Sequence, residues 1–87
     1  MRESDIEAHL VARTRERGGE CRKVKWIGRN GAPDRLVMLP GASIWVELKN
    51  TGERCSPAQI REHQAMRSMG QRVEVIDSFE GVDALLP

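Results

Sequence analysis

The chain has 87 residues, of which 39% are hydrophobic and 31% charged, and its formal net charge at pH 7 is +1. This length supports one domain, over residues 1–87, and the composition is globular rather than disordered or membrane-embedded. No apolar run approaches the ~20 residues that cross a bilayer, and the residues after Met1 are polar rather than signal-like, so we expect a cytoplasmic protein.

The positions of the charged residues and of the two cysteines further limit the classes of protein to which the chain could belong. Residues 1–29 contain eight Lys or Arg and five acidic residues, whereas residues 61–87 contain three and five. This asymmetry indicates either one face that can meet phosphate or an ordinary solvated surface. Cys21 and Cys55 lack Cys-x-x-Cys spacing, so the sequence predicts free thiols in a reducing compartment and no zinc ribbon.

The first expected element is a helix over residues 5–17. Ser4-Asp5-Ile6-Glu7 has the capping-box pattern, and apolar residues follow at helical spacing until Gly18-Gly19 ends the run. Residues 21–27 then mix basic and apolar positions in alternation, which predicts a half-exposed strand.

The remaining elements are separated by turn-forming residues. Ser56-Pro57-Ala58-Gln59 supplies an N-cap, a proline at the first helical position and a closing glutamine, so it predicts the start of a helix. The expected elements in chain order are a loop over 28–33, a strand over 35–39, a turn over 40–43, a strand over 44–49, a loop over 50–55, a helix from 57 to about 69, a strand over 72–76 and a short helix over 78–86. This order predicts an α/β fold.

The strand over 44–49 carries the residues that point to chemistry. Alternation places Glu47 and Lys49 on one face, about 6.7 Å apart along the backbone. Asp34 begins the preceding strand and can join them if the two strands pair as a hairpin. Two carboxylates with a backbone carbonyl suit Mg²⁺, and a nearby lysine can orient or deprotonate a water or neutralise charge on a phosphate. Taken alone, Glu47 and Lys49 could be a surface salt bridge and Asp34 a turn residue.

Three motifs together resemble a known family: Gly31-Ala32-Pro33-Asp34-Arg35, then Val46-Glu47-Leu48-Lys49, then Ser56-Pro57-Ala58-Gln59. The combination is similar to the VRR-NUC group of the PD-(D/E)XK nuclease superfamily over nearly the whole chain. The resemblance implies a restriction-endonuclease-like α-β-β-β-α-β core, with a central mixed sheet flanked by helices. It also implies an active site made of Glu7, Asp34, Glu47, Lys49 and Gln59.

The activity that the resemblance implies is metal-dependent hydrolysis of DNA phosphodiester bonds, with Mg²⁺ or Mn²⁺ as the cofactor. We expect Asp34, Glu47, the Leu48 carbonyl and Glu7 to hold the metal and Lys49 to help the attacking water. Stand-alone VRR-NUC proteins of this size resemble phage-encoded homodimers that cleave four-way DNA junctions. This implies Holliday junction resolution inside a bacterial or phage-infected cell. The alternatives are a flap, nick or restriction-like nuclease and a non-catalytic DNA-binding module with a nuclease fold.

Several residues have a structural interpretation beside the functional one. Glu7 and Gln59 each close a capping-box pattern, so each could stabilise its helix rather than serve the site. His9 and His63 lack ligand spacing, so we expect surface or structural roles. His63 lies one turn after Gln59, which leaves contact with the substrate as the lesser alternative.

The expected partners are DNA and a second copy of the chain, with no membrane. The basic residues that could line a phosphate backbone, or could merely keep an edge strand soluble, are Arg22, Lys23, Lys25, Arg29 and Arg35. A two-fold dimer would match the symmetry of a four-way junction. Trp26 and Trp45 are more typical of core or dimer contacts than of base stacking, and Trp26, Met66 and Met69 are candidate exposed dimer residues.

Overall fold

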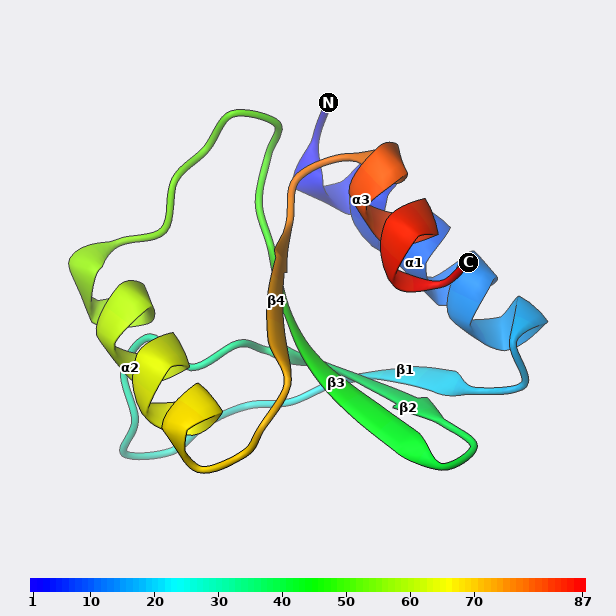
Figure 1. The fold of residues 1–87 in the computed structure, drawn as a ribbon. Helices are drawn as coiled ribbons and strands as arrows, with labels where there is room; N and C mark the ends of the chain where they lie inside the picture. Colours follow the sequence, from blue (N-terminus) through cyan, green and yellow to red (C-terminus); the bar gives the residue numbers. More distant parts are fainter.

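The chain forms a four-stranded sheet with helices on both faces, as the computed structural model of residues 1–87 shows (Figure 1). Its elements in chain order are α1 (Glu3–Glu16), β1 (Glu20–Lys23), β2 (Arg35–Leu39), β3 (Ala42–Leu48), α2 (Pro57–Ser68), β4 (Val73–Ile76) and α3 (Phe79–Leu85). The predicted α/β class and the order of elements are confirmed. None of the three helices has the length and apolar character that crossing a bilayer requires.

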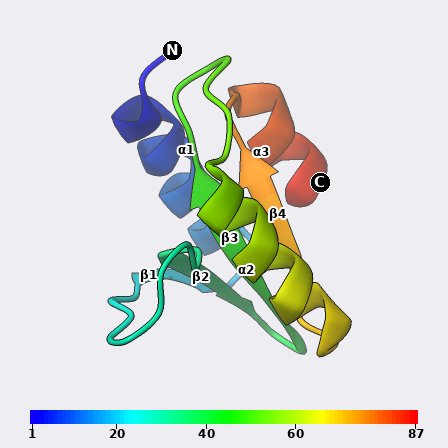
Figure 2. The same cartoon turned by 90° about the vertical axis from the view of Figure 1, so that its left-hand side faces the viewer.

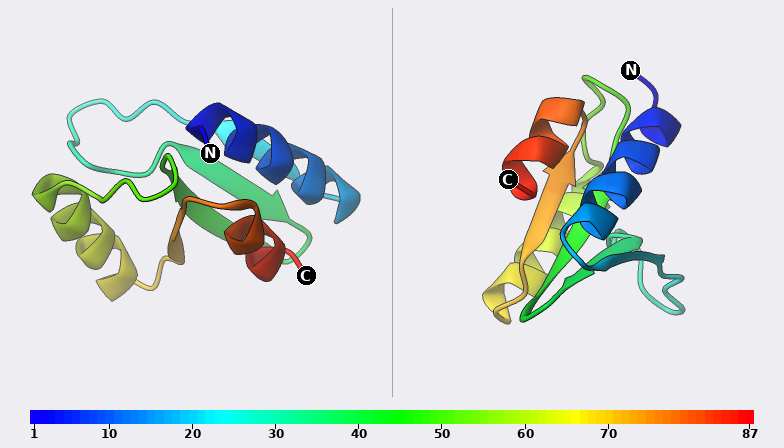
Figure 3. Two further views of the ribbon diagram at one scale, coloured as in Figure 1. Left: turned by 90° about the horizontal axis from the view of Figure 1, so that it is seen from above. Right: turned by 90° about the vertical axis from the view of Figure 1, so that its right-hand side faces the viewer.

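The strands lie in the order β1-β2-β3-β4. β1 and β3 are both antiparallel to β2, whereas β3 and β4 are parallel. A parallel pair needs a long crossover connection, and α2 lies within it. α2 therefore covers one face of the sheet and lies in front of β3 in Figure 2, while α1 and α3 lie side by side over the other face (Figure 3).

The hydrophobic core fills the space between the sheet and the layer of α1 and α3. Alternation along β3 directs Ile44, Val46 and Leu48 toward this layer, and all three are almost fully buried. The other members of the core cluster are Ile6, Leu10, Val37, Ile76, Val82 and Leu86. Because the apolar side chains of β3 are used on this side, its polar side chains are left for the face beneath α2.

The start of α1 differs from the prediction. The helix begins at Glu3 with Arg2 as its N-cap, so Ser4 lies inside the first turn and the expected Ser4–Glu7 capping box is wrong. Asn50, in a loop distant in sequence, binds a backbone N–H that has no partner within the helix: its Oδ1 accepts a hydrogen bond from the Glu3 N–H at 2.7 Å. A local sequence pattern contains no signal for a contact of this kind.

The first strand is shorter than expected. β1 ends at Lys23, and residues 24–34 form an irregular loop where a strand to Ile27 was predicted. Pairing with the neighbouring strand stops after the Val24 N–H, which donates to the Asp34 carbonyl at 2.9 Å. A side chain continues the connection between the two arms of this loop, since the Trp26 indole N–H donates to the Pro33 carbonyl at 2.8 Å.

The structure shows where two side chains lie whose surroundings the sequence alone could not determine, His9 and Met66. His9 contacts Asp83 at 2.7 Å and stacks on Phe79, so it joins α1 to α3. Met66 is only 4% exposed, and the expectation that it lies on an exposed dimer surface is wrong because the inner face of α2 buries it against the sheet. Met69 remains exposed.

Ile6→Ala tests the contribution of α1 to the core. Ile6 is fully buried, so this substitution should lower the free energy of unfolding by about 2–5 kcal/mol. Ile27 is 90% exposed, and Ile27→Ala, the matched control, should change that free energy by less than about 0.5 kcal/mol. Urea denaturation followed by circular dichroism measures both, and equal losses for the two variants would contradict this core.

Candidate active site

Pairing between β2 and β3 sets the geometry of the site. Arg35 lies opposite Val46 in the ladder, so continuing the register by one residue places Asp34 opposite Glu47. Residues directly opposite each other share a face of the sheet, and Lys49 follows on that face two residues after Glu47. The structure thus brings Asp34, Glu47 and Lys49 together on the face that α2 covers.

Gln59 connects α2 to this group. Its side-chain oxygen accepts hydrogen bonds from Lys49 Nζ and from the Ser56 N–H, each at 2.8 Å. The Ser56 hydroxyl accepts in return from the Gln59 N–H at 3.2 Å, which completes a capping box. The sequence left open whether Gln59 caps a helix or belongs to the site, and here one oxygen makes both contacts. Lys49 is held by one hydrogen bond and keeps two further N–H donors.

Glu47 is a buried carboxylate beside a buried lysine. It is 8% exposed, and burial raises its pKa from the usual 4.5 to about 7. The Lys49 ammonium lowers this pKa, whereas the Asp34 carboxylate raises it. Because the pKa of Glu47 stays high in spite of the lysine, ionising this carboxyl group is costly, and a bound cation would lower that cost.

His63 lies against Glu47 on the inner face of α2. It is 2% exposed, so the predicted surface role is wrong for this histidine, while the structural role and substrate contact stay open. Its Nε2 is 3.5 Å from Glu47 Oε1 and has no hydrogen-bond partner. Burial lowers the pKa of His63, and the charges of Arg67 and Lys49 lower it further, against smaller opposing effects of Glu62 and the Gly31 backbone. In the sequence, the one feature that placed His63 near the site was its position one helical turn after Gln59.

Arg35 connects Glu7 to Asp34 through two ion pairs. Its guanidinium is buried, with one terminal nitrogen against the Glu7 carboxylate and the other 2.8 Å from Asp34 Oδ1. Arg35 thus contacts carboxylates where the sequence suggested phosphate. Glu7, on α1, is joined to the rest of the site through this arginine, and it caps no helix in the structure.

The loop before Asp34 is fixed against the start of α2. Gly31 has a φ of +87°, and a Cβ there would lie 2.5 Å from the Ala58 carbonyl oxygen. Only glycine allows this approach without displacing the helix. Together with the indole bond from Trp26 to Pro33, this contact sets the position from which the chain enters β2 at Asp34.

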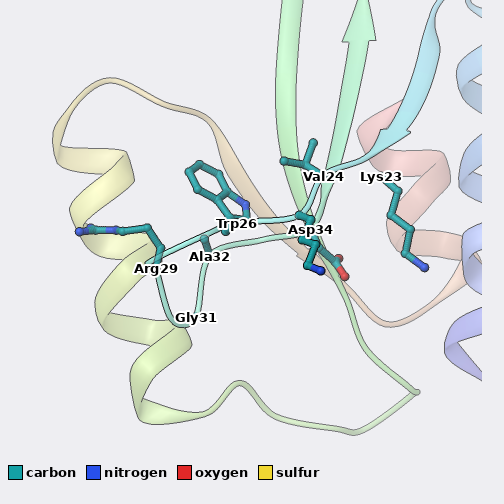
Figure 4. Close-up of a pocket in the computed structure, with 8 residues that line it drawn as sticks. Lys23, Val24, Trp26, Arg29, Gly31, Ala32 and Asp34 are labelled. Carbon is teal, nitrogen blue, oxygen red and sulfur yellow. The ribbon is translucent and has the colours of Figure 1, made fainter.

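A hollow of about 570 Å³ lies beside Asp34 (Figure 4). Of the five basic residues predicted to meet DNA, Lys23, Lys25 and Arg29 line it. Figure 4 shows Lys23 and Arg29 extending to opposite sides of the loop, with Asp34 between them. Arg29 also forms an ion pair with Glu62 at 2.7 Å. The other two lie elsewhere: Arg22 pairs with Glu20 on the edge strand, and Arg35 is buried.

The side chains do not form a complete metal site by themselves, since no group of three or more His, Cys, Asp or Glu lies close enough to hold an ion. A backbone ligand at Leu48 has a structural basis. The backbone N–H groups of Trp45 and Lys49 point toward β4. Because the backbone groups of successive residues in a strand point to alternate sides, those of Leu48 point toward β2. There the continued register places Pro33, which has no N–H to offer the Leu48 carbonyl.

The raised pKa of Glu47 predicts a pH-dependent stability in metal-free buffer. The folded state binds this proton more tightly, so the contribution of Glu47 to the free energy of unfolding is largest below pH 4.5 and is lost as the pH rises to about 7. Glu47→Gln should therefore be more stable than the wild type at pH 8, by up to about 3 kcal/mol, and equal to it near pH 4.

Denaturation at both pH values in the presence of a chelator measures this difference. Glu80→Gln, at an exposed position in the first turn of α3, is the matched control and should show no such pH dependence. A stability difference for Glu47→Gln that is the same at pH 4 and pH 8 would contradict the raised pKa.

Two known proteins are similar to this chain over nearly its whole length. No protein-family profile matches the chain. "Putative nuclease p44" of Acyrthosiphon pisum secondary endosymbiont phage 1 is 46% identical over 88 aligned residues, which cover 100% of this chain and 94% of the relative. A solved structure described as a VRR_NUC domain superposes with a TM-score of 0.87 at 40% identity, covering 95% of this chain and 91% of that one. The shared fold and the nuclease relative show that this chain belongs to the VRR-NUC nuclease family.

Proposed function

We propose that the protein is a Mg²⁺-dependent DNA endonuclease that acts on branched DNA as a homodimer. The observation that carries the proposal is the placement of Asp34 opposite Glu47, with Lys49 fixed beside them by Gln59. Two acids and a lysine with free donors, meeting at one end of a sheet, suit the hydrolysis of a phosphodiester.

The residues on the α2 face fit a divalent cation. Asp34 and Glu47 would provide carboxylate oxygens and Leu48 its carbonyl, while water would fill the remaining positions, as Mg²⁺ prefers. The high pKa of Glu47 also supports a cation at this place, because a cation would lower the cost of ionising a buried acid next to another acid. Glu7 would act through Arg35, which holds Asp34, or would bind the metal after separating from that arginine.

The bound metal would polarise the phosphate and make a coordinated water more acidic. Lys49 uses one N–H to bind Gln59, so its other two can donate to the attacking water or to an oxygen of the scissile phosphate. Gln59 in turn has its oxygen occupied by Lys49 and Ser56, which leaves its NH₂ group as a donor toward the substrate. These donors would stabilise the charge that grows on the phosphate in the transition state.

The DNA backbone would approach along the hollow beside Asp34. Lys23, Lys25 and Arg29 lie there, and neutralisation of phosphates by such residues supplies most non-specific affinity for DNA. The opening of this hollow at Asp34 would bring a phosphate between the basic residues and the acidic pair.

Branched DNA is proposed because stand-alone VRR-NUC proteins of this size resemble phage-encoded homodimers that cleave four-way junctions, and the size of the chain then favours a dimer. A protomer with a longest dimension of 32 Å has one set of site residues, whereas resolving a four-way junction needs two coordinated cuts. A two-fold dimer supplies two equivalent sites in the symmetry of such a junction. Met69 is an apolar side chain exposed on the protomer and is a candidate for that contact.

Substitutions in the acidic pair and the lysine test the chemistry. Asp34→Asn and Lys49→Ala should each lower the cleavage rate with Mg²⁺ by about 10²-fold or more, because each removes a group that acts on the phosphate, while DNA binding is kept. Cleavage on a radiolabelled four-way junction and a gel-shift assay measure the two quantities. Glu80→Gln, distant on α3, is the control and should cleave like the wild type. Full activity of both site variants would contradict the assignment.

A panel of DNA substrates tests the specificity. The wild type should cut a four-way junction faster than a nicked, flapped or linear duplex of the same sequence, and a chelator should stop all cutting. Analytical ultracentrifugation should show a dimer at the protein concentration that supports junction cleavage. Equal rates on linear and branched DNA, or a monomer active on junctions, would contradict the branched-DNA proposal and leave the nuclease chemistry in place.

A further inference from the structure

We infer that His63 is a positioning residue for Glu47: its imidazole holds the Glu47 carboxylate in the orientation that binds the divalent cation. This inference rests on the proposed function, since it assigns a task to His63 in the same site. It concerns a residue that the sequence placed among surface or structural positions.

The first observation is that the His63 Nε2 atom is buried without a partner. The residue is 2% exposed, and this nitrogen neither reaches solvent nor makes a hydrogen bond. A buried polar atom in this condition destabilises the folded state, because it gives up its hydrogen bonds to water and gains none in return. A leucine would fill the same space without that cost, so packing alone does not account for an imidazole here.

The second observation is the direction of that nitrogen. Glu47 Oε1 lies 3.5 Å away, which is a few tenths of an ångström longer than an ordinary N–H···O hydrogen bond. An imidazole carries an N–H on at least one of its two ring nitrogens in either protonation state. With this hydrogen on Nε2, a small movement of either side chain pairs it with the Glu47 carboxylate.

The third observation is that α2 would then orient both members of the Glu-x-Lys pair. Gln59 already binds Lys49 at 2.8 Å, and His63, one turn further along the same helix face, contacts Glu47. Carboxylates that bind metals are commonly hydrogen-bonded by such outer residues, whose loss lowers metal affinity 10- to 100-fold. The contact of Gly31 with the start of α2 ties the Asp34 loop to this same helix.

The test compares two substitutions of different chemistry. His63→Gln places an amide donor near the position of Nε2, whereas His63→Leu fills the volume without a donor. Isothermal titration with Mn²⁺ in the absence of DNA should show about 10- to 100-fold weaker binding for His63→Leu and near wild-type binding for His63→Gln. Met66→Leu, a change of packing on the same buried face of α2, should bind Mn²⁺ like the wild type.

A second pair of measurements separates positioning from folding. His63→Asn has an amide too short to reach Glu47, so it should bind Mn²⁺ more weakly than His63→Gln although both are polar. The Mg²⁺ concentration for half-maximal cleavage should rise in the same order, with the KM for DNA unchanged. Equal Mn²⁺ affinity for the Gln and Asn variants, or for His63→Leu and the wild type, overturns the inference. A wild type that binds no Mn²⁺ and cuts no DNA overturns the proposed function itself.

Discussion

The register of β2 against β3 is the constraint on which the arrangement of the candidate active site depends. It directs Val37 into the core and sets Asp34 opposite Glu47 on the other face. A shift of one residue would exchange the faces of one strand, placing an acid in the core and an apolar side chain beneath α2. The cost of that exchange fixes the register. The apolar contacts that stabilise the fold therefore also align the two acids.

Burial of charge distinguishes the end of the sheet where β2 begins and β3 ends from the rest of the molecule. Glu47, Lys49 and Arg35 are each at most 8% exposed, and buried charges are costly unless other groups compensate them. The two helix layers supply different parts of that compensation: α1 provides Glu7 for the arginine, and α2 provides Gln59 for the lysine. The carboxylate of Glu47 is the least compensated member, as its raised pKa shows. Metal binding is the function that would use this property.

The sequence predicted the elements well where the signal was local. Alternation in β3 and the Ser56–Gln59 capping box both appear in the structure. It failed where a distant contact decided the outcome, as at the start of α1, which Asn50 completes from another loop. The Arg35 ion pairs and the burial of His63 are likewise tertiary effects, because they depend on which helix lies over which face of the sheet.

In the proposed metal site, Asp34, Glu47 and the Leu48 carbonyl together hold a divalent cation. The most direct measurement is an anomalous difference map from crystals of the protein soaked in Mn²⁺. We expect one strong peak within about 2.0–2.5 Å of an oxygen from each of these three residues. A map without a peak there, or with Mn²⁺ bound only at surface acids elsewhere, would show that these residues do not form the metal site.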